Sequence, residues 1–291
     1  MKALILGSNG QDGFYLNKLL SEYNIDVITV SRKNALFIGD ISNLDFISKI
    51  IEENKPEYIF HLAANSSTRH NLLFENHATI ETGTLNVLES SRIHSPESNI
   101  FISGSAMQFK NTGKPIDENT PFEASSPYSL SRIQSTYAAR YYRDKFGLKV
   151  FVGYFFNHDS PLRSESHVNQ KIVKAVQRIH QGVNEELTLG NIDVRKEFNF
   201  AGDIVEAIWK LVNQETIFEV VIGSGEAYSI KEWVEYCFSL KGLDWRKYVK
   251  VENNFIPEYS TLVCNPTLLK SIGWQPKTTI FELAKIMMDN E

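Results

Sequence analysis

Tyr128 and Arg132 stand four positions apart in the stretch SSPYSLSR, so on a helix the phenol and the guanidinium share one face. Upstream, the apolar run NIFISGS ends in Ser103 and Ser105. A phenol beside a permanent cation can exchange a proton with a hydroxyl that a nearby serine holds in place. Because an unperturbed phenol has a pKa of about 10, the cation is needed to favour the ionised form near neutral pH. These residues predict acid–base chemistry; the alternative is a surface tyrosine on a tyrosine-rich helix.

The flanking sequence predicts the elements that carry these side chains. Ser126 suits a helix N-cap and Pro127 the first helical position, so Tyr128 opens a helix that runs to Gly147. The run 99–105 is typical of a buried strand that ends at the two serines. We therefore expect the tyrosine, the cation and a serine to converge where a nicotinamide would lie.

The N-terminal segment supplies a turn that suits a dinucleotide. A buried-strand run, KALILG, is followed by Gly7, Gly10 and Gly13 and then by helical spacing of apolar residues. Glycines let the backbone approach a pyrophosphate closely, and the helix N-terminus favours the anion. The spacing is G-x-x-G-x-x-G, and a plain turn before a helix is the alternative. The predicted cofactor contacts in this turn are Gly7, Asn9, Gly10, Gln11, Asp12 and Gly13.

The next strands predict which dinucleotide binds and where. The strand IDVITV runs into Ser31, Arg32 and Lys33, and cations without an acid favour the 2′-phosphate of NADP over NAD. A solvated surface pair is the alternative. A third strand over 37–42 and a fourth that enters a small-residue loop within 57–67 let the backbone come close to the cofactor. Their predicted contacts are Asp40, Ile41, Leu62, Ala63 and Ala64.

The alternation of strands and helices over more than a hundred residues predicts an α/β fold with a doubly wound, Rossmann-type parallel sheet. We expect residues 1–160 and about 194–222 to form the NADP-binding domain. The smaller C-terminal α/β substrate domain would comprise about 161–193 and 223–291, with the substrate in the cleft between the two.

Composition narrows the class further. The chain has 291 residues, a net charge of −5 and 42% apolar residues, which argues against nucleic acid as a partner. No apolar run approaches a membrane span, and no His or Cys pattern predicts a metal site. Cys237 and Cys264 lie far apart and favour a reduced pair, so we expect a cytoplasmic protein without a membrane partner.

The catalytic stretch and the glycine turn together resemble the extended short-chain dehydrogenase/reductase family, whose signature adds Y-x-x-x-K. The resemblance implies that Tyr128 exchanges a proton with a substrate hydroxyl during hydride transfer. It also implies that the cation at position 132 holds the nicotinamide ribose. Here that cation is Arg132, whose shape and hydrogen-bond geometry differ from those of lysine.

Longer stretches are similar to the GDP-mannose 4,6-dehydratases within that family. The run YFFNHDSPLRSESHVNQKIVKAVQRI (154–179) resembles their F-N-H-E-S-P-R-R, and LGNIDVRKEFNFAGDIVEAI (189–208) and GSNGQDGFYL resemble two further motifs. The resemblance covers nearly the whole chain and implies a GDP-linked nucleotide sugar and a homodimer or homotetramer. By resemblance Asn157 lies by the nicotinamide and sugar, His158 and Arg163 contact NADP, and Lys171 and Lys196 lie near the substrate diphosphate.

The sequence also departs from that branch. Without gaps, its T-S-E falls on Gly104, Ser105 and Ala106, so the threonine that orients the sugar and the glutamate that removes a proton are absent. Ser103 or Ser105 replaces the threonine if the loop is shifted by one. Phe255 stands where an arginine is expected. Three hypotheses follow: a 4,6-dehydratase, a nucleotide-sugar 4-ketoreductase or dehydrogenase without elimination, and an NADP-binding paralogue without catalysis.

Overall fold

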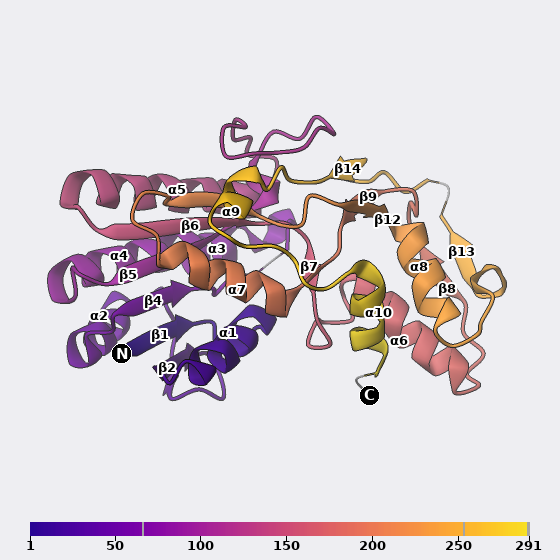
Figure 1. Ribbon diagram of the computed structural model, residues 1–291, viewed down its shortest axis with the longest axis horizontal. Coiled ribbons are helices and arrows are strands. Elements are labelled where there is room, and N and C mark those ends of the chain that lie inside the picture. The colour runs from indigo at the N-terminus through magenta and orange to yellow at the C-terminus, as the bar shows by residue number, and fades with distance from the viewer. Residues whose placement is uncertain (66, 253, 290–291) are drawn as a thin grey trace.

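The computed structural model describes residues 1–65, 67–252 and 254–289, so Ser66 of the expected small-residue loop lies outside the described residues. A seven-stranded parallel sheet with the order β11-β6-β5-β4-β1-β2-β3 forms the larger lobe (Figure 1). The predicted Rossmann-type α/β fold is therefore confirmed. The strands of this sheet are β1 (Lys2–Leu6), β2 (Asp26–Ser31), β3 (Phe37–Ile38), β4 (Tyr58–His61), β5 (Asn99–Ser105), β6 (Lys149–Phe155) and β11 (Glu219–Ile222).

Helices cover both faces of the sheet because β1, β4, β5 and β6 are buried on both sides along most of their length. One buried cluster joins the sheet to α2 (Leu44–Asn54), α4 (Gly83–His94) and α5 (Pro127–Phe146). A second cluster joins its other face to α1 (Gln11–Glu22) and α7 (Ala201–Val212). Between β4 and α4 the chain adds a 3-10 turn (His70–Leu72), α3 (Leu73–Asn76) and a π-helical turn (His77–Thr82).

The smaller lobe has its own apolar core. That core packs side chains of α6 (Val168–His180), α8 (Ile230–Ser239) and α10 (Ile280–Asp289) around Trp233. Leu269 and Trp274, which follow later in the chain, pack instead on the α7 side of the large sheet. The remaining short elements are β7 (His158–Asp159), β8 (Leu187–Leu189), β9 (Arg195–Glu197), β10 (Asn199–Phe200), β12 (Ala227–Ser229), β13 (Val249–Val251), β14 (Thr261–Leu262), α9 (Thr267–Ser271) and 3-10 turns at Ala106–Gln108 and Trp245–Lys247.

The third strand is shorter than the expected span of 37–42. It ends at Ile38, because the chain turns at Asp40, whose Oδ1 accepts from the Ser42 amide at 2.9 Å and from the Ser42 hydroxyl at 2.8 Å. The Asn43 amide then donates to the Asp40 carbonyl at 3.1 Å. Local side-chain-to-backbone bonds of this kind replace ladder bonds, so the strand stops.

Helix α5 begins and ends as the sequence predicts. The Ser126 hydroxyl accepts from the Ser129 amide, Pro127 occupies the first turn, and Gly147 closes the helix at φ 70°. Along its length Arg140 and Arg143 donate to Glu219 of β11 at 2.6–2.9 Å. This ion-pair cluster fixes α5 against the sheet and so fixes the position of Tyr128 at its start.

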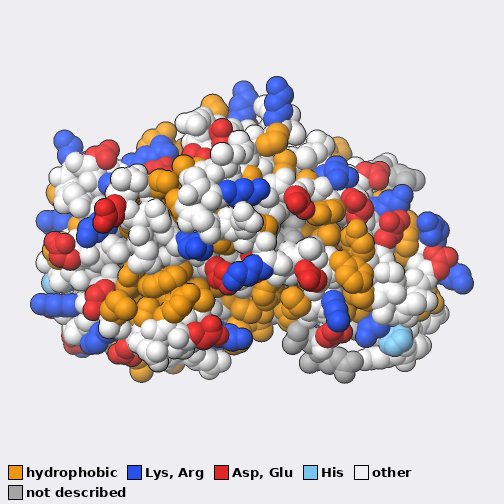
Figure 2. Space-filling view, in the orientation of Figure 1, with side chains coloured by type: hydrophobic (Ala, Val, Ile, Leu, Met, Phe, Trp, Pro, Cys, Tyr) orange, Lys and Arg blue, Asp and Glu red, His pale blue; other side chains and the backbone are white. Residues whose placement is uncertain are grey.

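The surface carries no broad field of one sign on the face that Figure 2 shows, where Lys and Arg side chains are interspersed with Asp and Glu. No helix in the described part of the chain is long and apolar enough to cross a membrane. Cys237 and Cys264 are both buried free thiols, in agreement with the expected reduced pair.

Candidate active site

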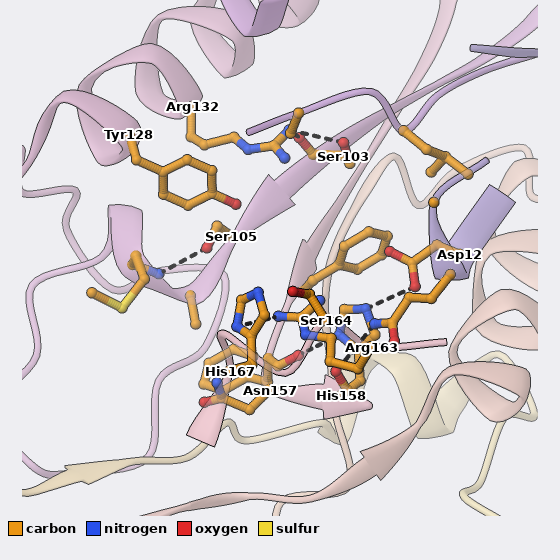
Figure 3. Close-up of a pocket in the computed structure, with 18 of the residues that line it drawn as sticks. Asp12, Ser103, Ser105, Tyr128, Arg132, Asn157, His158, Arg163, Ser164 and His167 are labelled. Carbon is orange, nitrogen blue, oxygen red and sulfur yellow. Dashed lines mark hydrogen bonds and ion pairs between the residues drawn. The ribbon is translucent and has the colours of Figure 1, made fainter. Parts of the chain in front are cut away.

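A cavity of about 360 Å³ joins the glycine turn to the start of α5. Its walls come from α1, the ends of β4, β5 and β6, the start of α5 and the segment that precedes α6 (Figure 3). The side chains and backbone that line it include Gly10, Gln11, Asp12, Leu62, Ala64, Ser103, Ser105, Ala106, Met107, Tyr128, Arg132, Asn157, His158, Arg163, Ser164 and His167.

Tyr128 and Arg132 lie on the same face of α5, with the guanidinium carbon 5.2 Å from the centroid of the phenol ring. Both side chains are buried. At this distance the cation interacts with the ring face and lies near any charge that develops on the phenol oxygen. The pair therefore lies on the wall of the first cavity, as expected for residues with an acid–base role.

Arg132 is held by Ser103. Its Nη1 donates to the Ser103 carbonyl and, at 2.8 Å, to the Ser103 hydroxyl, which itself donates to the His61 carbonyl at 2.9 Å. The Nε–H of Arg132 has no hydrogen-bond partner within the described residues. The Ser103 hydroxyl is thus fully used inside the protein, whereas Arg132 keeps a buried donor at the cavity wall.

Of Ser103 and Ser105, only Ser105 has a hydroxyl hydrogen without an acceptor among the described residues. Its Oγ accepts from the Met107 amide at 3.2 Å, which leaves its hydrogen available to donate into the cavity. Gly104 lies on the opposite face of β5, where a Cβ would come within 2.6 Å of the Tyr154 ring. A threonine at position 104 would neither fit nor face the cavity. The geometry of this chain favours the alignment shifted by one, which places Ser105 at the threonine position.

The glycine turn fits a dinucleotide phosphate. Gly7 has φ +91°, and a Cβ there would lie 2.7 Å from the Ala63 nitrogen. A Cβ on Gly13 would lie 2.5 Å from the Gly7 carbonyl oxygen. No side chain caps the N-terminus of α1, so its amides are free to face an anion. The close approach of the Gly7 turn to the loop after β4 brings Ala63 beside it.

Asp12 and His158 form a buried ion pair at the next edge of the cavity. The His158 Nε2 lies 2.9 Å from the Asp12 Oδ1, and its Nδ1 lies 2.8 Å from the Phe156 carbonyl. Burial alone would lower the pKa of His158, but the Asp12 carboxylate outweighs it and raises that pKa. In turn burial would raise the pKa of Asp12, but His158 and then Arg163 lower it. The imidazolium therefore donates to both acceptors and locks α1 to β7.

Lys196 faces a second cavity, of about 270 Å³, with Val168, Gly190, Phe255 and Tyr259. Burial lowers the pKa of Lys196 to about 8; the Asp159 carboxylate opposes this shift and Arg163 adds to it. The ammonium lies 5.3 Å from the Phe198 ring centroid. At pH 7 this site therefore holds a cation with little hydration, beside an apolar wall that suits a flat ring.

Other predicted residues lie away from the first cavity. Arg32 is exposed just after β2, Asp40 is exposed, and Ile41 belongs to the sheet core. Asn9 donates to the Lys33 carbonyl and so ties the glycine turn to the loop that bears Arg32. Lys171 is exposed and donates to the Thr188 carbonyl at 2.8 Å, outside the lining of both cavities.

Carboxylates are scarce around the first cavity. Asp12, which is paired with His158, is the one acid among the described residues that line it. Ala106 and Met107 follow Ser105 on the wall. Glu118 accepts from the Val221 amide at 2.8 Å and does not line the cavity. Within the described residues no group of three or more His, Cys, Asp and Glu could hold a metal ion.

Sequence reasoning missed His167, Ser164 and Met107, all of which line the first cavity. It also missed the apolar character of the second cavity. A single histidine in a polar stretch has no periodic or spacing signal, and only the path of the chain between β7 and α6 brings it to the cavity.

The Asp12–His158 pair predicts a pH-dependent stability. Because the pKa of Asp12 is lowered, the pair is complete above about pH 4. Because the pKa of His158 is raised, its contribution is complete below about pH 6.5 and falls as the pH rises through the raised value. His158→Gln should therefore lower the free energy of unfolding by about 2 kcal/mol at pH 6 and by less at pH 9. Urea unfolding at both values measures this.

The control is His180→Gln, because His180 is exposed at the end of α6 and should change stability little at either pH. A His158→Gln loss of equal size at pH 6 and pH 9 would contradict the ion pair.

Comparison with known proteins gives the family. Residues 4–287 match the family model described as GDP-mannose 4,6 dehydratase. GDP-mannose 4,6 dehydratase 1 of Arabidopsis thaliana is 30% identical over 321 residues, which cover 99% of this chain and 89% of the relative.

Two solved structures share the fold at 19% identity, each with 99% of this chain and 98% of the other covered. They are the UDP-glucose 4-epimerase of Thermus thermophilus in complex with NAD, with a TM-score of 0.84, and RMD of Pseudomonas aeruginosa complexed with NADPH, with a TM-score of 0.86. On the match to its family model and the full-length relative, the chain belongs to the GDP-mannose 4,6-dehydratase family and is an enzyme that acts on nucleotide sugars.

Proposed function

We propose that the protein transfers a hydride at C4 of a GDP-linked hexose with NADP, with Tyr128 as the acid–base group. The observation that carries this is the meeting of Tyr128, Arg132 and Ser105 in one cavity with an uncapped glycine turn. The Arabidopsis thaliana relative, which matches this chain over 99% of its length, is a GDP-mannose 4,6 dehydratase, and this supports GDP-mannose as the substrate to test.

The residues act in a defined order in the oxidation direction. Tyr128, in its ionised form, takes the proton of the C4 hydroxyl, and Ser105 donates a hydrogen bond to the same oxygen. Arg132 places its guanidinium carbon 5.2 Å from the centroid of the phenol ring, close to the negative charge that develops on the phenol oxygen during the transfer. When bound, NADP supplies the acceptor for the hydride that leaves C4. In the reduction direction Tyr128 returns the proton to the oxygen.

The dinucleotide would be held by this chain's own backbone and cations. The amides at the start of α1 would bind the pyrophosphate, and the guanidinium of Arg132, which lines the cavity, would lie by the nicotinamide ribose. Arg32 would bind the 2′-phosphate of NADP. Lys196 would face the diphosphate of the sugar nucleotide, with the base against the apolar wall near Phe255.

Tyr128→Phe tests the acid–base assignment. Loss of the proton-transfer group should lower the rate of cofactor reduction with GDP-mannose by about 10²- to 10⁴-fold. Absorbance of the reduced nicotinamide measures the rate, and NADP affinity should change little. Tyr23→Phe is the control, because Tyr23 is about half exposed and lies outside the lining of the first cavity. Activity that survives in Tyr128→Phe would refute the mechanism.

A 4-ketoreductase or dehydrogenase without elimination is the second candidate. It is favoured by the lining of the cavity, where Asp12 is the one carboxylate within the described residues and is paired with His158. Removal of the C5 proton and loss of water need a further acid–base group. We therefore expect that mass spectrometry will show no loss of one water molecule from GDP-mannose. A product lighter by one water would establish the 4,6-dehydratase instead.

Arg32→Ala tests the cofactor. The side chain is exposed and follows β2, where a 2′-phosphate would lie. Loss of one charge-assisted contact should weaken NADP about tenfold at low salt and leave NAD unchanged. Titration of the protein fluorescence with each dinucleotide measures both affinities. Arg246→Ala is an exposed control. Equal effects on the two dinucleotides would mean that Arg32 does not read the phosphate.

We also propose that two copies of the chain pair through α4 and α5. Exposed apolar side chains gather on these neighbouring helices: Leu85, Ile93, Leu130, Tyr137, Tyr141 and Phe146. A face of this kind on a protein of this size is typical of an interface. Light scattering of the purified protein gives the mass of the assembly.

A further inference from the structure

His167 enters the catalytic cavity from the small lobe. It is the residue before α6, and it lines the same cavity as Tyr128 and Ser105. Figure 3 shows its ring on the side of the cavity where Asn157 lies, with Tyr128 across the space. The proposed hydride transfer gives this side chain no role.

The hydrogen bond with Arg163 fixes the tautomer of His167. The Nη2 of Arg163 lies 3.2 Å from the Nδ1 of His167. A guanidinium can only donate, so Nδ1 supplies the lone pair and the ring hydrogen lies on Nε2. Arg163 is held in place by Asp159, whose Oδ1 lies 3.5 Å from the Arg163 Nε.

The ring is neutral at pH 7. Burial lowers the pKa of His167 to about 4, Arg163 and Lys196 add to this shift, and Asp159 opposes it. A neutral imidazole in this tautomer presents one N–H and no free lone pair. It can therefore donate a hydrogen bond to a ligand, but it cannot act as the base that the elimination step needs.

We propose that the Nε2–H of His167 binds the hexose itself, by donating to a sugar hydroxyl other than the C4 hydroxyl that Tyr128 and Ser105 hold. The inference rests on the proposed function, because it needs a sugar in this cavity. Neutral donors match neutral hydroxyls, whereas the nearby cations Arg163 and Lys196 match phosphate. His167 is thus a residue that distinguishes a nucleotide sugar from the free nucleotide.

The test compares two ligands and two substitutions. Calorimetry with NADPH present, which prevents oxidation, gives the affinities for GDP-mannose and for GDP. His167→Phe keeps a flat ring and removes the donor, so it should weaken GDP-mannose about three- to tenfold and leave GDP unchanged. His167→Gln keeps a neutral N–H donor and should stay within about twofold of the wild type for both ligands.

Controls separate binding from folding. His180→Phe, at the exposed end of the same helix, should change neither affinity. Unchanged NADPH affinity in His167→Phe shows that the large lobe is intact. If His167→Phe weakens GDP and GDP-mannose equally, or neither, the inference is overturned while the proposed function stands. If the wild type binds neither GDP nor GDP-mannose, the proposed function itself fails.

Discussion

The buried guanidinium of Arg132 is the constraint on which the site depends. It is 4% exposed, and within the described residues no carboxylate forms an ion pair with it, so its charge is met by the Ser103 carbonyl and hydroxyl and by the Tyr128 ring face. Those contacts join the first turns of α5 to the end of β5, which sets Tyr128 against Ser105. The same charge, added to burial, lowers the pKa of neighbouring His61 to about 3 and keeps that ring neutral. A cation that could not make these contacts would leave the start of α5 less firmly held against the end of β5.

The charges around the two cavities explain what the site binds and what it lacks. The carboxylates of Asp12 and Asp159 are paired with His158 and Arg163. Among the described residues Lys196 and Arg132 form no ion pair with a carboxylate, so the cavities favour an anionic ligand. These cations therefore suit a ligand that carries a diphosphate.

The sequence was sufficient where local chemistry decides the structure. Ser126, Pro127 and Gly147 set the limits of α5, and strong alternation of apolar runs set the parallel sheet. It was insufficient where a contact across the fold decides. Gly104 is excluded from the cavity by strand alternation and by the Tyr154 ring, neither of which a linear alignment contains. The position of His167 depends on how the chain crosses between lobes, and the exposure of Lys171 depends on which face of α6 packs on Trp233.

The site is divided between the two lobes, and this division shows where the chain differs from its family. The large lobe holds what oxidation at one carbon requires: a phenol, a cation, a hydroxyl and a phosphate-binding turn. The small lobe and the segment that leads to it supply Lys196, Arg163 and His167, to which we assign recognition of the substrate. The positions of the family's Thr and Glu lie instead in the large lobe, at the end of β5 and in the turn that follows it, where Ser105, Ala106 and Met107 line the first cavity. These positions therefore lie on the cavity wall with Tyr128, whereas Lys196 lines the second cavity.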